Sequence, residues 1–312
     1  MANDTWGQAH ANNTIGFGQG EINSDNGWGD IYRFSHAGDT NLRGYKYDAL
    51  VMEWEIPGSA AGVSKNWAYG SSVISNRNFT IDWGDGTVED KTGVVYFLTH
   101  TYAAAGTYTV QIYNQSGDGA EVMRFGSGGA DYTGTNNMIT DIKQWSTVYS
   151  IDSYQKMFFD CDNIGLITAR NTPDLSGTRF LTSMFENSGT SIQLNETASY
   201  WDTSNVIDMR YMFKYTRMLN NGFDVSKWSI TGLTAAKGAT NMFLGYSNES
   251  DWAISTENYD KLLIGWGNQA ASVNTGVNFS AGSTKYTGGG EAASGRAALV
   301  AAGWVITDGG TV

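Results

Sequence analysis

The sequence predicts a mainly β protein that ends in a stack of repeated units with an α/β cap. Its 312 residues include 39 Gly, only 2 Pro and many aromatic side chains (11 Trp, 17 Tyr and 13 Phe), a balance that favours short strands and tight turns over long helices. Alternating polar and apolar residues in the first half of the chain indicate half-buried strands. A Met-Phe pair recurs four times in the second half, which predicts units that bury their apolar edges against one another.

Residues 1–44 carry a short repeat that predicts a docking segment. An aromatic residue followed by glycine recurs every eleven residues, at Trp6, Phe17 and Trp28. Each unit is too small and too polar to form a core of its own. Because three regularly spaced aromatic side chains would leave a sticky patch on a monomer, we expect this segment to pack on a partner protein or on sister chains. The alternative is a Gly-rich cap over the sheet of the next domain.

Residues 45–114 predict a β-sandwich. Their strands are expected to have one apolar face each, and strands of that kind bury it between two sheets. The apolar faces of the three clearest strands consist of Leu50, Met52, Trp54 and Ile56; of Phe79, Ile81 and Trp83; and of Tyr108, Val110 and Ile112.

Two motifs among these strands carry a family resemblance. The first reads Asp82-Trp83-Gly84-Asp85-Gly86, and the second places His100-x-Tyr102 shortly before Gly106-x-Tyr108-x-Val110. Together they resemble the PKD (polycystic kidney disease) type of immunoglobulin-like domain. The resemblance implies that these positions are structural and that the module is a spacer or binding domain outside cells. We therefore interpret Asp82 and Asp85 as turn residues and not as a catalytic carboxylate pair.

Residues 115–140, rich in Gly, Asp and Asn, predict a connection to a repeat block at 141–248. The Met-Phe pairs of this block are spaced 27, 28 and 30 residues apart. They lie at 157–158, 184–185, 212–213 and 242–243. Val206, Met209, Met212 and Phe213 are spaced like the buried stripe of one or two helical turns. We therefore expect a helical turn around each pair, with Met and Phe in the core.

The best-kept repeat runs from Trp201 to Phe213 and reads WDTSNVIDMRYMF. It resembles the repeat unit of the BspA-like leucine-rich-repeat surface proteins of bacteria. The resemblance implies a short β/α solenoid of the leucine-rich-repeat type. Residues 249–312 are similar to the tail that closes many such blocks, which implies a C-terminal α/β cap. The sequence itself indicates an amphipathic helix through Tyr259, Leu262, Leu263 and Trp266, a helix at 291–302 and a strand at 304–307.

Charge and apolar content exclude two classes of partner. With 31 acidic and 19 basic residues the formal net charge is −12, and no Lys/Arg cluster offers a local exception, so we expect no nucleic-acid binding. No apolar stretch approaches the roughly 18 residues that a membrane-spanning helix needs, so we expect no membrane insertion. The first residues also lack the basic and apolar regions of a secretory signal.

We find no residues that predict catalysis, a metal site or a cofactor. The three histidines, at positions 10, 36 and 100, have no partners at the spacing of a triad or of metal ligands. The segment from Asp160 begins like a calcium loop, but Ile164 stands where an oxygen ligand is needed. The single cysteine, Cys161, cannot form an internal disulfide and is interpreted as a core residue.

Modules typical of extracellular adhesion, in a chain for which no export signal, disulfide or anchor is predicted, favour a virion protein. The first forty residues also resemble N-terminal segments of phage tail and fibre proteins. We therefore expect a phage virion structural protein, an adhesin-type tail or head fibre that is made in the host cytoplasm and acts outside the cell. Residues 1–44 would dock it to other virion proteins, and fibres of this kind are usually homo-oligomers.

The repeat surface is expected to bind a host cell-surface glycan or protein. Its candidate anchors are Tyr200, Tyr211, Tyr215 and Tyr246, because tyrosine combines contact area with a polar tip. The alternative is that these tyrosines pack between repeats. Three other functions stay open: a bacterial cell-surface adhesin, a polysaccharide-binding accessory module of a degradative enzyme, and a purely architectural virion protein that binds no host molecule.

Overall fold

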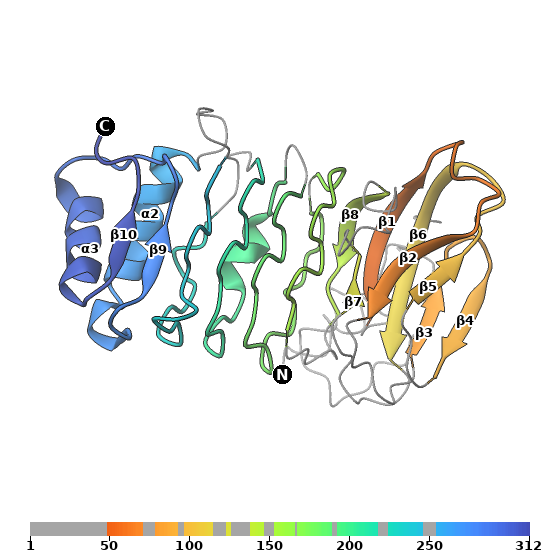
Figure 1. Cartoon of the computed structure of the whole chain (residues 1–312), viewed down its shortest axis with the longest axis horizontal. Coiled ribbons are helices and arrows are strands. Elements are labelled where there is room, and N and C mark those ends of the chain that lie inside the picture. Colours follow the sequence, from red (N-terminus) through yellow and green to blue (C-terminus); the bar gives the residue numbers. More distant parts are fainter. Residues whose placement is uncertain are drawn as a thin grey trace, which may run out of the picture. The chain divides into compact units, whose positions relative to one another are not determined.

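The computed structural model describes residues 49–70, 79–92, 97–114, 123–125, 138–146, 153–165, 167–188, 192–217, 224–245 and 254–312. The chain divides into two compact units, Met1–Tyr47 and Asp48–Val312, and the description that follows concerns the second. This unit is mainly β, and α2 and α3 are the α-helices of its described part (Figure 1).

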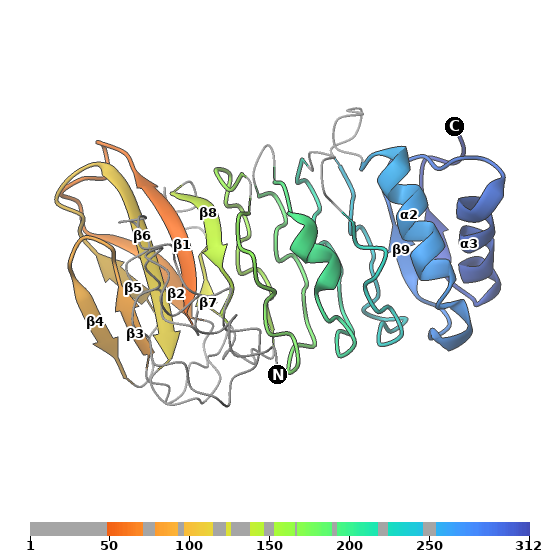
Figure 2. The same ribbon diagram turned by 180° about the vertical axis from the view of Figure 1, so that it is seen from behind.

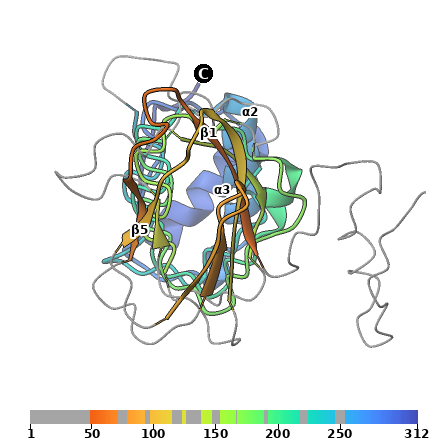
Figure 3. The ribbon, with the colours of Figure 1, turned by 90° about the vertical axis from the view of Figure 1, so that its right-hand side faces the viewer.

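Two antiparallel sheets form the first part of this unit. Their strands are β1 (Leu50–Ile56), β2 (Lys65–Gly70), β3 (Phe79–Asp82), β4 (Val88–Lys91), β5 (Phe97–His100), β6 (Gly106–Asn114), β7 (Met123–Arg124) and β8 (Ile139–Gln144). The larger sheet has the order β4-β3-β6-β1-β8, and the smaller has the order β5-β2-β7. Figure 3, a view along the unit, shows β1 and β5 on different sides of it.

The core between the sheets is aromatic and confirms the predicted apolar faces. The side chains of β1 that were expected inside are buried, as are Val110 and Ile112 of β6, while Tyr108 is half-buried. The Trp54 ring lies edge-on to Trp83 and to Phe125, with ring centroids 6.3 Å apart in both pairs. Since Phe125 directly follows β7, these contacts join the larger sheet to the smaller one.

The Met-Phe pairs form tight turns, so the helical turn expected around each pair is wrong. In the third repeat the N–H of Met212 donates to the C=O of Met209 at 3.3 Å, and Tyr211 between them has a left-handed backbone with φ +59°. The residue before each of the other three pairs is left-handed as well: Lys156, Ser183 and Asn241. A right-handed helix cannot include such residues. The predicted burial of Val206, Met209, Met212 and Phe213 is nevertheless confirmed.

Backbone hydrogen bonds join each Met-Phe turn to the next. In the third turn the N–H groups of Tyr211, Phe213 and Tyr215 donate to carbonyl oxygens of the fourth turn at 2.8–3.0 Å. The same alternation of donors links the first turn to the second and the second to the third. The four phenylalanine rings stack in parallel, with centroids 5.5–5.8 Å apart. Each turn therefore acts as a rung that is held by its neighbours on both sides.

Both sheets continue into this block of rungs. On one side, the N–H of Phe125 donates to the C=O of Met157 at 2.7 Å, and its ring stacks on Phe158 at 5.7 Å. On the other side, the C=O of Ile142 in β8 accepts the N–H of Ala169 at 2.9 Å. A single apolar core therefore runs from the sheets into the repeats.

The C-terminal part closes the last rung with two helices and two short strands (Figure 2). They are α2 (Thr256–Gly267), β9 (Asn278–Ser280), α3 (Gly290–Ala301) and β10 (Val305–Thr307), with a 3-10 turn at Ala270–Ser272 (η4). Another 3-10 turn, η2 (Glu196–Tyr200), lies in the repeat block. The predicted helices and last strand are confirmed, and Ser255 caps α2 by accepting the N–H of Asn258. The N–H of Ala239 donates to the backbone C=O of Asn278 at 2.9 Å, so β9 follows the fourth turn as the next rung. In the described part of the chain, no helix has the length and apolar character needed to cross a bilayer.

Candidate functional site

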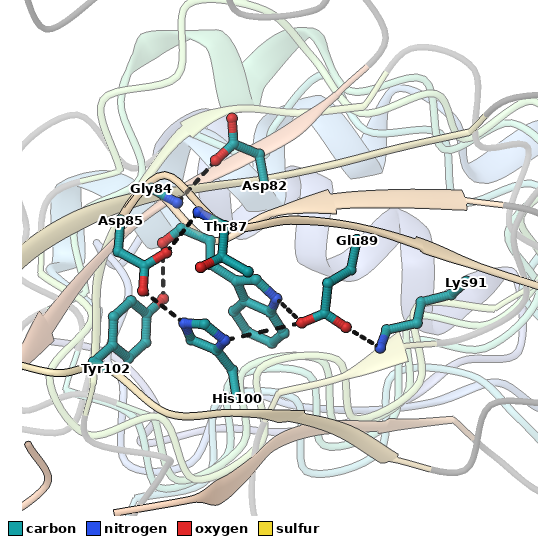
Figure 4. Close-up of polar contacts among 9 residues, drawn as sticks. Asp82, Gly84, Asp85, Thr87, Glu89, Lys91, His100 and Tyr102 are labelled. Carbon is teal, nitrogen blue, oxygen red and sulfur yellow. Dashed lines mark hydrogen bonds and ion pairs between the residues drawn. The ribbon is translucent and has the colours of Figure 1, made fainter. Parts of the chain in front are cut away.

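The first candidate site is a polar cluster at the turn between β3 and β4 (Figure 4). Asp82 accepts the N–H of Gly84 and Asp85 accepts the N–H of Thr87, both at 2.9 Å, so both carboxylates serve the turn as predicted. Partial burial raises the pKa of Asp85. Hydrogen bonds from the Thr87 N–H and from His100 outweigh this effect and bring that pKa below its usual value.

Sequence reasoning missed the partner of His100 in this cluster. The His100 Nε2 atom lies 2.8 Å from Asp85 Oδ2, and the imidazole stacks on the Trp83 ring with centroids 4.5 Å apart. The two residues are 15 positions apart, and their only signal was that both belong to the motifs of the PKD resemblance. The ring is nearly enclosed, with 8% of its side chain exposed.

The geometry of this cluster indicates a structural role, which is to hold the turn after β3 in place. The second imidazole nitrogen of His100 lies 3.9 Å from Glu89 Oε1, which also accepts the Trp83 indole N–H at 2.9 Å. The Tyr102 hydroxyl donates to the Trp83 carbonyl at 2.9 Å, and burial raises the pKa of that hydroxyl. A triad histidine instead turns one nitrogen to a nucleophile and the other to a carboxylate. Here both nitrogens face carboxylates, so the cluster ties the turn to β4 and β5.

Within the described parts of the chain, neither a metal site nor a reactive thiol is indicated. No three His, Cys, Asp or Glu side chains of those parts are grouped so that they could hold a metal ion. Cys161 is buried in the first repeat, as predicted. Burial, followed by the nearby Asp160 and Asp162 carboxylates, raises the pKa of its thiol well above the usual value. Such a thiol is a poor nucleophile.

The second candidate site is the outer surface of the Met-Phe turns. The Lys214 ammonium lies 5.1 Å from the centroid of the Tyr211 ring and 4.4 Å from that of Tyr215, and it pairs with Glu186 at 3.0 Å. Both tyrosines are half-buried. The structure therefore brings together two of the predicted tyrosines, and a lysine that sequence reasoning did not single out lies over both rings.

Two more lysines of the repeat block lie over aromatic rings. The Lys156 ammonium is 5.2 Å from the Phe159 ring centroid, and the Lys237 ammonium is 4.6 Å from that of Phe180. Phe180 forms parallel bridges with the first and third repeats, which places it in the same stack of rungs. We call the surface of these half-buried side chains the Met-Phe face. It comprises Lys156, Phe159, Phe180, Tyr211, Lys214, Tyr215 and Lys237.

Tyr200, another predicted anchor, lies elsewhere. Tyr200 ends η2, has 66% of its surface exposed and contacts the Lys227 ammonium at 4.5 Å. The η2 segment belongs to the side of the repeat block that continues β8. The Met-Phe face lies on the other side, which continues β7. Tyr200 is therefore not part of that face. Tyr246, and the predicted docking residues Trp6, Phe17 and Trp28, lie outside the described residues.

Comparison with known proteins gives one family match. Residues 152–260 match a family described as Mycoplasma protein of unknown function, DUF285. The match covers most of the repeat block and the start of α2, and it agrees in part with a BspA-like surface protein. No curated protein and no solved structure matches the chain at a significant level.

Proposed function

We propose that this chain is an attachment protein of a phage virion and that the repeat block carries its binding surface. The observation that carries the attachment role is the Met-Phe face, a row of aromatic and basic side chains on hydrogen-bonded rungs. Binding through such a surface needs little ordering of side chains on contact, because the rungs already hold them in place. Half-buried tyrosines are suited to it, since they offer area and a polar tip.

We further propose the finer architecture that the resemblances implied. The two sheets would form a PKD-like immunoglobulin sandwich that serves as a spacer, and the rungs would form a leucine-rich-repeat-type solenoid. Support for the solenoid comes from the regular hydrogen bonds between successive turns and from the parallel stack of phenylalanine rings. Residues 1–44 would dock the chain to other virion proteins, on the evidence of the eleven-residue aromatic repeat.

The proposed protein binds and does not catalyse. It would need no cofactor, would act outside the cell as part of the particle, and would form a homo-oligomer, because repeated weak contacts gain strength from being linked. Its partners would be virion proteins at one end and a host cell-surface glycan or protein at the Met-Phe face. The polar cluster around His100 supports this function only by keeping the spacer rigid.

The family match favours a second candidate, a bacterial cell-surface adhesin, because the matching family is described from a bacterium. The same face would then act from the cell that makes the protein. A polysaccharide-binding accessory module and a purely architectural virion protein remain the other two candidates.

Mass spectrometry of purified phage particles, together with infection assays, tests the proposal. We expect the chain in the particles, and we expect antibodies against residues 153–245 to block infection. Presence in the particles without any block would favour the architectural role. Presence on bacterial cells, with none in particles, would favour the bacterial adhesin and overturn the virion assignment.

A further inference from the structure

The Met-Phe face differs in charge from the rest of this acidic chain. Of its acidic neighbours, Asp208 accepts hydrogen bonds from Nε and Nη2 of Arg210 at 3.0 and 2.8 Å, and Glu186 is paired with Lys214 at 3.0 Å. Asp160, on the first Met-Phe turn, accepts a hydrogen bond from the Asn187 side chain. The ammonium groups of Lys156 and Lys237 lie over the Phe159 and Phe180 rings. The charged members of the face itself are thus three lysines, in a chain whose formal net charge is −12.

The Asp-x-Ser turns on the repeat block have the opposite character. Asp174, Asp202 and Asp224 each accept the N–H of the serine two residues later, at 2.9–3.0 Å. These turns form a separate column, since the Asn205 side chain of one turn donates to the Ser176 carbonyl of another at 2.7 Å. The repeat block thus separates an acidic column from a basic, aromatic face.

Three side chains of the Met-Phe face stand on left-handed backbone. Lys156, Tyr211 and Tyr215 have φ of +59°, +59° and +57°. A non-glycine residue pays about 1–3 kcal/mol of strain for this conformation, and glycine would avoid it. These three positions nevertheless carry large side chains of the face.

We propose that the Met-Phe face binds an anionic polysaccharide laid along the stack of rungs. The aromatic rings offer flat apolar surfaces to the C–H faces of sugar rings, and the lysines offer N–H donors to sugar carboxylates. Equivalent rungs are about 4.8 Å apart, so a polymer laid along the stack crosses several of them and can contact the face at more than one point. This inference rests on the proposed attachment function and names the chemical class of its ligand.

Titration of the full chain with alginate, a carboxylate polysaccharide, tests the inference, with neutral dextran as the matched uncharged polymer. We expect binding to alginate that weakens as salt rises, and none to dextran. Equal binding to both polymers, or to neither, would contradict the anionic specificity. Equally tight binding to DNA would show that charge alone is recognised and would overturn the assignment to a sugar.

Single lysine substitutions locate the surface. We expect Lys156→Gln and Lys237→Gln each to weaken alginate binding about two- to fivefold, and the double variant to multiply these losses. Lys156→Arg should bind as the unchanged chain does, since it keeps the charge. The control is Lys227→Gln, which removes the same charge and the same kind of ring contact at Tyr200, away from the face.

Loss of binding in Lys227→Gln to the same extent as in Lys156→Gln would contradict the assignment to this face. Melting temperatures of all variants check that the fold survives. If the chain binds alginate but is absent from phage particles, only the virion assignment fails. If antibodies block infection but alginate does not bind, only the ligand class fails.

Discussion

The sheet region and the repeat block both contain residues with a left-handed backbone, but they use different residue types there. In the sheet region, the described residues with left-handed backbone are glycines, such as Gly84 and Gly86 of the turn after β3. In the Met-Phe turns the equivalent role falls to seven residues with side chains. They are Lys156, Asp160, Ser183, Asn187, Tyr211, Tyr215 and Asn241.

The difference teaches what holds each region in shape. A hairpin turn is local and must suit its own residues, which favours glycine. A rung is bonded to the turn before it and to the turn after it, so its backbone is imposed from outside and tolerates strained residues. The repeat block can therefore carry side chains at positions where a hairpin needs glycine.

The largest effect should come from breaking the stack at its centre. Phe185 is fully buried and stacks on Phe158 at 5.5 Å and on Phe213 at 5.8 Å. We expect Phe185→Ala to lower the free energy of unfolding by about 3–5 kcal/mol, measured by urea denaturation. Tyr200→Ala, at an exposed ring, should change it by less than about 0.5 kcal/mol. Similar losses in the two variants would mean that the phenylalanine stack is not the core of the block.

The turn after β3 offers a matched pair of glycine substitutions. A Cβ at Gly84 would lie 2.5 Å from the Thr109 carbonyl oxygen of β6, whereas a Cβ at Gly86 would meet nothing within 4 Å. Both residues have positive φ. We expect Gly86→Ala to cost about 1–2 kcal/mol through strain alone, and Gly84→Ala to cost about 2–4 kcal/mol, because β6 must also move. Thermal unfolding of both variants measures the difference, and equal costs would rule out the close approach.

Much of this fold could be predicted from sequence because apolar periodicity reports burial directly. The alternation in β1, the helical face of α2 and the Met-Phe spacing all marked residues that are buried. The helical turns were wrong for an understandable reason. Met209, Met212 and Phe213 have the spacing of a helical stripe, but a tight turn with one left-handed residue produces the same buried set, and no local signal at Tyr211 distinguishes the two.

A substitution toward glycine should stabilise a rung and, at the same time, weaken the proposed function. We expect Lys156→Gly to raise the free energy of unfolding by about 0.5–1 kcal/mol, since it relieves backbone strain, and to reduce alginate binding. The control is Gln155→Gly, at the neighbouring residue, whose φ is not left-handed. It should destabilise the fold by about 0.5–1 kcal/mol. If Lys156→Gly were also destabilising, the rung would not be strained at this residue.

The smallest effect concerns the pH dependence of the sheet region. The pKa of Asp85 is lowered in the folded state, so the unfolded state binds the proton more readily. Its contribution to stability is therefore full above the unfolded pKa of about 3.9 and is lost as the pH falls below that value. We expect Asp85→Asn to melt at a lower temperature than the unchanged chain near neutral pH, with the gap closing in acid. A gap that stays constant at every pH would exclude this role of the carboxylate.

The candidate site was less predictable than the fold. Tyrosine was a reasonable guess for the surface, and Tyr211 and Tyr215 do lie together, but Tyr200 has the same residue type and lies on other rungs. The lysines were missed because their grouping depends on the stacking of rungs. Lys237 reaches Phe180, which is 57 positions earlier in the chain. Only the register of the turns reveals such a contact.

Hydrogen exchange of the backbone amides tests the central claim most directly, namely that the Met-Phe turns are rungs bonded to one another. The N–H groups of Tyr211, Phe213 and Tyr215 should exchange as slowly as those in the pairing of β1 with β6, because both sets are bonded within the same unit. Rapid exchange at these three amides, with β1 and β6 still protected, would contradict the stack and the binding face built on it.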